Sequence, residues 1–159
     1  EDTLQDCIGR VLTACGKTVS AAESCTGGTI SELLTSVAGS SAYYLGSVTS
    51  YANSVKSGVL GVAPEIIERY GAVSSECVAA MAEGVRKLTG SDFSVATSGI
   101  AGPGGGSEEK PVGTVWIGIS SQNSTETMKL QFKGDRKRNI ERFAAYALDL
   151  LRKKIIREI

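Results

Sequence analysis

Residues 39–56 carry four side chains that could do chemistry together. Ser41 offers a hydroxyl, Tyr51 a phenol, Asn53 an amide and Lys56 an amine. The chain of 159 residues contains no histidine, so a hydrolytic reaction would need another group to move protons. A lysine can replace imidazole when burial keeps its amine neutral. The sharpest catalytic hypothesis is therefore a pair in which Ser41 is the nucleophile and Lys56 is the base.

This hypothesis makes an energetic demand on Lys56. With its ordinary pKa, a lysine is neutral in only about one molecule in 2,000 at pH 7. Lowering the pKa to between 7 and 8 needs about 3–4 kcal/mol of differential stabilisation. A partly buried site could supply it. On the residues alone, a lysine on a short helix is more often a solvated side chain.

A glycine-containing turn, ESCTGG, lies between a strand expected at residues 18–22 and a helix expected at 29–38. The amides at a helix start attract anions, so Thr26, Gly27 and Gly28 are candidates for binding a phosphate or carboxylate. The alternative is a tight turn that simply requires glycine. Cys25 in this turn could act as a thiol nucleophile, although the chain provides no histidine base.

A second glycine-rich segment, residues 99–113, follows a strand expected at residues 93–98. Ligands of open α/β sheets bind beyond the carboxyl ends of the strands. Ser98 and the backbone amides of Gly99, Ile100 and Ala101 are therefore predicted to face a substrate. The pattern is neither a Walker A loop nor a dinucleotide-binding fingerprint, and a loop without a ligand is the alternative.

The remaining elements follow from periodicity and capping residues. We expect further strands at residues 44–51, 114–120 and 125–132, and further helices at 2–15, 53–60, 64–70, 76–88 and 136–156. The expected helix caps are Asp2 with Gln5, Asn53, either Ser74 or Ser75, and Asp135. Early strands alternate with helices and late strands form a hairpin. This order predicts one α/β domain over residues 1–159, with helices on both faces of a mixed, mostly parallel sheet.

Composition limits the function classes. Equal numbers of acidic and basic residues give no support for nucleic-acid binding. No apolar run approaches the roughly 20 residues that span a membrane. The four cysteines form no CxxC pair, so we expect neither structural zinc nor disulfides, and we expect a reducing cytoplasm. We predict no cofactor and no metal.

Six motifs occur together in this chain and carry a family resemblance. The motifs are ESCTGG, AGSSAYY, TSYANSVK, GAVS, TSGIAGPGGGSEEKPVGTVW and FKGDR. In order and spacing, from about residue 4 to residue 151, they resemble the CinA C-terminal domain family of nicotinamide-nucleotide amidases, also called NMN deamidases.

The resemblance implies a three-layer α/β/α domain, usually dimeric, that hydrolyses the carboxamide of nicotinamide mononucleotide (NMN). The products would be nicotinate mononucleotide and ammonia. On this reading Ser41 is the nucleophile, Tyr51, Lys56 and Ser98 complete the catalytic set, and the phosphate lies against the Thr26 turn or Arg136, which starts the last helix.

Two other hypotheses come from different classes. The domain could be a nucleotide-binding regulatory module that keeps the pocket without the chemistry. Alternatively, it could be a thiol hydrolase built on Cys25. We expect the small-molecule nucleotide and a second copy of the chain as partners, and no nucleic acid or membrane.

Overall fold

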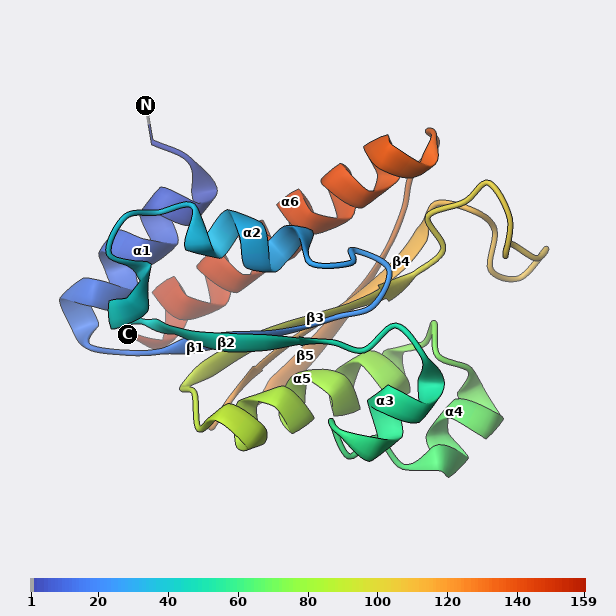
Figure 1. Ribbon diagram of the computed structural model, residues 1–159, viewed down its shortest axis with the longest axis horizontal. Helices are drawn as coiled ribbons and strands as arrows, with labels where there is room; N and C mark the ends of the chain where they lie inside the picture. Colours follow the sequence, from blue (N-terminus) through green and yellow to red (C-terminus); the bar gives the residue numbers. More distant parts are fainter. Residues whose placement is uncertain (1) are drawn as a thin grey trace.

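The computed structural model describes residues 2–159. Its centre is a five-stranded sheet in the order β2-β1-β3-β4-β5 (Figure 1). The strands are β1 (Val19–Glu23), β2 (Tyr44–Thr49), β3 (Phe93–Gly99), β4 (Thr114–Ser121) and β5 (Thr125–Gln131). Strand β1 pairs in parallel with β2 and β3, whereas β4 is antiparallel to both β3 and β5.

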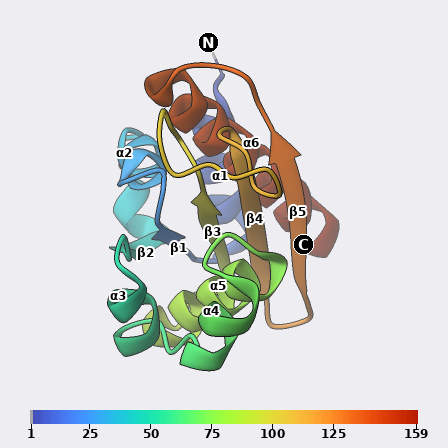
Figure 2. The ribbon, with the colours of Figure 1, turned by 90° about the vertical axis from the view of Figure 1, so that its right-hand side faces the viewer.

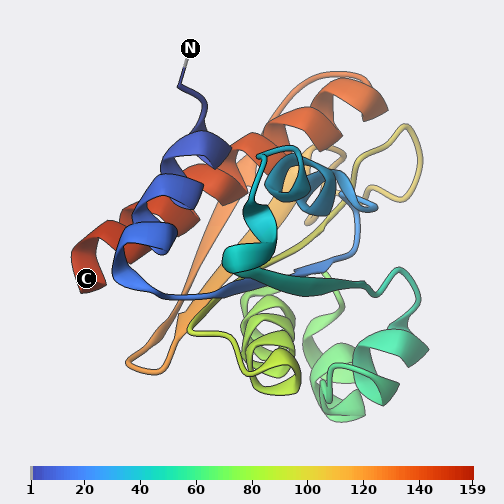
Figure 3. The same cartoon turned by 60° about the vertical axis from the view of Figure 1, so that its left-hand side comes forward.

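Helices cover both faces of this sheet (Figures 1 and 3). One face carries α1 (Leu4–Cys15), α2 (Thr29–Thr35) and α6 (Arg136–Glu158). The other carries α3 (Asn53–Gly58), α4 (Pro64–Tyr70) and α5 (Ser75–Thr89), and a short 3₁₀ turn, η1 (Ser40–Ala42), precedes β2. The predicted three-layer α/β/α fold is confirmed. Its mixed sheet has a parallel core, β2-β1-β3, and an antiparallel hairpin on one side.

Each face of the sheet has its own hydrophobic core. Strand β1 is buried at all five positions because helices cover both of its faces. One core joins the sheet to α1, α2 and α6 through residues such as Leu12, Leu34 and Phe143. The other joins it to α5 through residues such as Val78 and Met81. The parallel strands are thus held rigidly, and their carboxyl ends have fixed positions.

Helix ends show where local prediction was right and where it was wrong. Ser74 caps α5 and Asp135 caps α6, as their hydroxyl and carboxylate chemistry predicts. Helix α1 is capped by Thr3 in a capping box with Asp6, so the prediction of Asp2 with Gln5 is wrong. Asn53 is the first residue of α3 rather than its cap. Helix α2 ends at Thr35 and is shorter than expected.

Within residues 2–159, every helix is either too short or too polar to cross a lipid bilayer.

Gly84 of α5 packs closely against the segment that follows α3. A Cβ at Gly84 would overlap the carbonyl oxygen of Leu60, and a backbone atom cannot easily yield. We expect Gly84→Ala to lower the free energy of unfolding by about 2 kcal/mol. Gly58→Ala is the matched control, because it is also helical and a Cβ there meets open space. Urea unfolding monitored by circular dichroism measures both. Equal stabilities would contradict the close approach.

Candidate active site

The carboxyl ends of the three parallel strands meet at one edge of the sheet (Figure 2). Glu23, the last residue of β1, pairs with Thr49, the last residue of β2. On the other side of β1, Ala22 pairs with Ala96 of β3. Residues that follow these pairs must therefore emerge close together. They are Ser24 after β1, the segment from Ser50 to Lys56 after β2, and Ser98 at the end of β3.

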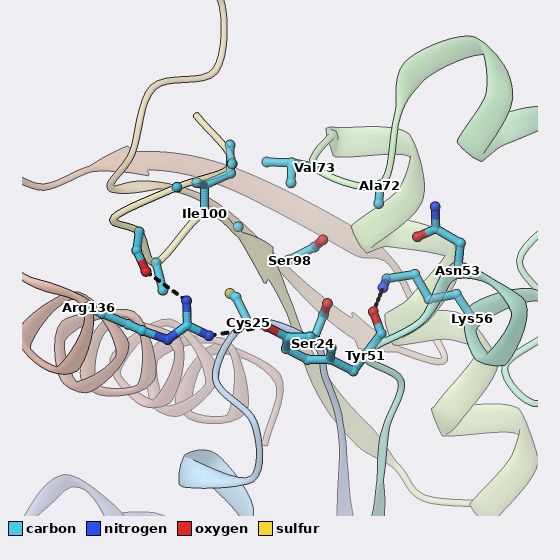
Figure 4. Close-up of a pocket in the computed structure, with 15 residues that line it drawn as sticks. Ser24, Cys25, Tyr51, Asn53, Lys56, Ala72, Val73, Ser98, Ile100 and Arg136 are labelled. Carbon is cyan, nitrogen blue, oxygen red and sulfur yellow. Dashed lines mark hydrogen bonds between the residues drawn. The ribbon is translucent and has the colours of Figure 1, made fainter. Parts of the chain in front are cut away.

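A pocket of about 250 Å³ opens at this edge. Side chains from all three strand ends, from the glycine loop and from the start of α6 surround it (Figure 4). The lining comprises Ser24, Cys25, Tyr51, Asn53, Lys56, Ala72, Val73, Ser98, Gly99, Ile100, Ala101, Gly102, Gly104, Gly105 and Arg136. Most of the residues that the sequence predicted for the site are therefore brought together here.

Lys56 is the central polar side chain of the pocket. It lies on α3 and is only 1% exposed. Its Nζ donates to the carbonyl oxygens of Ser50, at 2.8 Å, and Tyr51, at 3.1 Å. None of the ion pairs found within residues 2–159 includes Lys56. Lys56 is therefore a buried amine without a carboxylate partner.

This environment favours the neutral amine. Burial lowers the pKa of Lys56 below its ordinary 10.5, and negative charge on the Cys77 or Cys25 sulfur would oppose the shift. A neutral amine has two N–H bonds and one lone pair. The two carbonyl oxygens can take both N–H bonds, which leaves the lone pair to accept a proton. The arrangement suits a general base.

One of the hydroxyls that share the pocket with Lys56 belongs to Ser24. Ser24 is the first residue after β1 and is 8% exposed. Figure 4 draws its side chain and that of Lys56 in the same cavity. The turn that follows leaves the amides of Cys25 and Thr26 without a hydrogen-bond partner among the described residues. An alcohol followed by free amides is the arrangement that acyl transfer requires of a nucleophile and its oxyanion donors.

The predicted pairing of Ser41 with Lys56 is wrong. Ser41 lies in η1, before β2, whereas Lys56 follows β2. The six residues of β2 separate the two ends by roughly 20 Å at about 3.3 Å per residue. In Figure 1 the η1 turn and α3 lie at opposite ends of this strand. Ser41 is exposed and does not line the pocket, so its hydroxyl cannot reach the amine.

The anion site predicted at the ESCTGG turn is already occupied by the protein. The Glu23 carboxylate is fully buried and accepts hydrogen bonds from the amides of Gly28, Ile30 and Ser31. Thr26 also donates its hydroxyl to Glu23, at 2.6 Å. Thr26, Gly27 and Gly28 do not line the pocket. Their prediction as substrate ligands is therefore wrong, because Glu23 takes the place of a bound anion.

Glu23 instead fixes the turn that carries Ser24. We expect Glu23→Ala to lower the free energy of unfolding by about 3 kcal/mol, because it leaves several buried donors without an acceptor. Glu32→Ala is the control, since Glu32 is an exposed acid in the first turn of α2, the helix whose amides Glu23 binds. Glu32→Ala should lower the free energy of unfolding by less than about 1 kcal/mol. Thermal or urea unfolding of the two variants measures the difference, and similar losses would contradict this role of Glu23.

The glycine loop contributes both a side chain and a backbone wall. Ser98 is 1% exposed, lines the pocket and its hydroxyl has no hydrogen-bond partner among residues 2–159. Gly99, Ile100 and Ala101 line the pocket as predicted. The Ile100 amide, however, donates to the Thr114 carbonyl, so it is not free to bind a substrate. A buried hydroxyl without a partner is consistent with a group that awaits a ligand.

Arg136, Tyr51 and Asn53 stand at the open side of the pocket, and all three are exposed. Arg136 is the first residue of α6, and its guanidinium donates to the Gly102 carbonyl oxygen at 2.7 Å and to the Tyr51 hydroxyl at 3.1 Å. Asn53 lies on the first turn of α3. Their locations are those that the sequence predicted. The Arg136 guanidinium brings a positive charge to an otherwise uncharged rim.

Cys25 also lines the pocket, but burial favours its protonated thiol. Burial raises the pKa of Cys25 to about 12, and the nearby Glu23 charge adds to the shift. A thiolate, rather than a thiol, is the nucleophile in cysteine chemistry. The structure therefore argues against Cys25 as a catalytic residue.

Ser24 is the residue that sequence reasoning missed. Its signal was present, because it directly follows a short apolar strand and precedes a glycine turn, the position where parallel sheets place ligands. The sequence analysis assigned substrate contacts only to the first three residues of the glycine-rich loop. The pocket lining also includes residues further along it, Gly102, Gly104 and Gly105.

Known proteins are similar to this chain in sequence and in fold. The family model "CinA C-terminal domain" matches residues 1–155. A CinA-like protein of Cytophaga hutchinsonii is 49% identical over 97% of this chain, and one of Desulfosudis oleivorans is 52% identical over 94%. These matches cover 37% and 36% of the two relatives. The chain thus spans little more than a third of their length.

Solved structures match over nearly their full length. The competence damage-inducible protein A of Klebsiella pneumoniae superposes with a TM-score of 0.94 at 36% identity, covering 98% of this chain and 97% of that one. A competence/damage inducible protein of Agrobacterium tumefaciens gives 0.90 at 36% identity, with 95% and 94% covered. Motifs, fold and family model agree, and the chain belongs to the CinA C-terminal domain family.

Proposed function

We propose that this chain is a nicotinamide-nucleotide amidase that hydrolyses the carboxamide of NMN with Ser24 as nucleophile and Lys56 as base. The observation that carries the proposal is the environment of the Lys56 amine. The amine is buried, lacks a carboxylate partner and has a pKa lowered by burial, and it shares a pocket with the Ser24 hydroxyl. A chain without histidine has here an alternative base for an alcohol.

The first half of the reaction forms an ester. Ser24 Oγ attacks the carboxamide carbon while Lys56 Nζ takes the hydroxyl proton. The developing oxyanion is stabilised by the amide of Cys25, the residue that follows Ser24 in the pocket lining, and such a donor is worth about 10²–10³ in rate. The C–N bond then breaks, and the proton held by Lys56 passes to the leaving nitrogen, which departs as ammonia. The nicotinate moiety remains attached to Ser24 through an ester bond.

The second half restores the enzyme. Water attacks the ester carbon while Lys56 removes one of its protons. The Ser24–carbon bond breaks, the alkoxide takes the proton back from Lys56, and nicotinate mononucleotide leaves. Ser98 and Tyr51 line the pocket and can hold the substrate or relay protons. No step requires a group from outside the chain other than water.

Arg136 is our candidate for binding the substrate phosphate. The alternative site, the Thr26 turn, already holds the Glu23 carboxylate. The guanidinium lies at the open side of the pocket, and its hydrogen-bond partners among residues 2–159 are uncharged oxygens. A planar fork of donors matches phosphate geometry. We also propose that the protein acts in the cytoplasm, and as a homodimer.

Ammonia release from NMN tests the proposal directly. The purified chain should produce one ammonia per nicotinate mononucleotide, and EDTA should not change the rate. The competing hypothesis, a regulatory module of the same fold, predicts NMN binding by calorimetry without ammonia formation over hours. That result would refute the amidase.

The thiol hypothesis has its own test. Because the Cys25 thiol stays protonated near neutral pH, Cys25→Ala should keep most of the activity, with a loss below about tenfold. Iodoacetamide, a thiol alkylating agent, should not inactivate the protein rapidly, since Cys25 is 7% exposed. Complete loss of turnover in Cys25→Ala, in a protein that still folds, would favour a cysteine nucleophile instead.

A further inference from the structure

The Arg136 side chain bridges two walls of the pocket. Nη1 donates to the carbonyl oxygen of Gly102, in the glycine loop, at 2.7 Å. Nη2 donates to the hydroxyl of Tyr51, after β2, at 3.1 Å. Figure 4 shows the guanidinium reaching to both partners. We call this pair of contacts the Arg136 bridge.

The Arg136 bridge joins a full positive charge to two neutral acceptors. None of the ion pairs within residues 2–159 includes Arg136. A phosphate dianion accepts two parallel N–H bonds from a guanidinium, and such charged hydrogen bonds are roughly twice as strong as neutral ones. A phosphate in the pocket mouth would therefore displace Tyr51, and with it Gly102, from Arg136.

Loss of the contact with Arg136 would free the Tyr51 hydroxyl. The Tyr51 side chain is 63% exposed, and in residues 2–159 its hydroxyl has a single hydrogen-bond partner, Arg136. The ring is otherwise free to turn once this contact is lost. Its own carbonyl oxygen accepts a hydrogen bond from Lys56 Nζ at 3.1 Å, so the backbone of Tyr51, but not its phenol, is held next to the base. The contact with Arg136 is therefore what keeps the phenol at the rim.

We propose that Arg136 is a specificity-determining residue that makes catalysis depend on the substrate's phosphate, an inference that rests on the proposed amidase function. The phosphate takes over the guanidinium and releases the Tyr51 hydroxyl. The phenol then donates its proton to the nitrogen of the breaking C–N bond. Lys56, which holds the proton of Ser24, reprotonates the phenolate. The phosphate thus acts on kcat and not only on binding.

The dependence of catalysis on the phosphate can be tested by supplying the substrate in two parts, the nucleoside and a separate phosphite dianion. The nucleoside that lacks the phosphate, nicotinamide riboside, should be hydrolysed slowly, and added phosphite dianion should raise its kcat/KM by at least about tenfold. Arg136→Met and Tyr51→Phe should each abolish the activation. Arg138→Met is the matched control, since Arg138 is exposed on the same helical turn and does not line the pocket. It should retain the activation.

Three kinetic results would overturn the proposal. Absence of phosphite activation in the wild type would show that the phosphate does not act on the chemical step. Activation that survives in Tyr51→Phe would show that release of the phenol is not the cause. A variant Arg136→Met that raises KM for NMN at unchanged kcat would likewise reduce Arg136 to a simple binding residue.

A second measurement does not depend on turnover. In protein with ¹³C-labelled tyrosine, the Tyr51 ring signal is assigned among the five tyrosines by comparison with Tyr51→Phe. Inorganic phosphate should shift this signal in the wild type and in Arg138→Met, but not in Arg136→Met. A signal that phosphate leaves unchanged in the wild type refutes the release. A shift in a protein that does not hydrolyse NMN would refute the amidase function and support the Arg136 bridge as a phosphate sensor.

Discussion

Ser24→Ala is expected to lower kcat for NMN hydrolysis by at least about 10³-fold, because it removes the attacking oxygen and leaves no second hydroxyl in the same position. KM should change little, since the alcohol contributes mainly to the transition state. Ammonia release over hours, with a coupled assay, measures the residual rate. Circular dichroism should show an unchanged fold, because the Ser24 side chain makes no hydrogen bond within residues 2–159.

Ser41→Ala is the decisive comparison. It replaces the serine that the sequence favoured, which lies before β2 and outside the pocket. Its rate should stay within about twofold of the wild type, as for most surface substitutions far from a site. The reverse outcome, an inactive Ser41→Ala and an active Ser24→Ala, would exclude the nucleophile that we propose.

Lys56→Met should also reduce kcat by at least about 10³-fold, because it removes the proton acceptor while keeping the volume of the side chain. Lys87→Met is the matched control, since Lys87 is exposed on α5 and outside this pocket. The wild-type rate should rise with pH as Lys56 loses its proton, and it should level off above a pKa that lies below 10.5. A rate that is flat from pH 6 to pH 10 would argue against Lys56 as the base.

The same substitution has a consequence for stability. Burial lowers the pKa of Lys56 in the folded state, so between that pKa and 10.5 the unfolded chain binds more protons. The contribution of Lys56 to the free energy of unfolding must therefore rise with pH across this window. Below the folded-state pKa, the penalty for burying the charge is present in full. Lys56→Met should remove this rise and be at least as stable as the wild type at pH 7.

Urea unfolding at several pH values measures this effect. The difference in stability between Lys56→Met and wild type should be largest at the low-pH end of the window and shrink as pH increases toward 10.5. A wild type that loses stability through Lys56 as pH rises would require a raised pKa, and would mean that the amine is held as an ammonium in the fold.

The sequence determined most of the framework of this protein. Periodic apolar residues predicted every strand and helix to within a few residues, because burial on one or both faces constrains such patterns strongly. The errors were local, as at the start of α1, where Thr3 rather than Asp2 accepts the hydrogen bond of the first turn. Several neighbouring polar side chains could accept the hydrogen bond from the first turn of a helix. Their order along the chain does not determine which of them accepts it.

The residues around the pocket were predicted for a physical reason. Ser98, Tyr51, Asn53 and Arg136 lie where strands end or helices begin, and Lys56 lies one turn further along α3. In a parallel sheet these positions fall on one edge, and the structure brings all five to one pocket. Chemistry at the edge of such a sheet can therefore be predicted from strand boundaries alone.

Which serine faces Lys56 was decided only by the tertiary structure. Ser41 is nearer to Lys56 in sequence, but a whole strand lies between them and carries them to opposite ends of the sheet. Ser24 is more distant in sequence, yet the parallel pairing of Glu23 with Thr49 aligns the two strand ends. The tertiary structure also decided which anion binds the amides at the start of α2. Only folding brings the Glu23 carboxylate to them. Sequence defined the groups available for chemistry, and strand pairing selected those that meet.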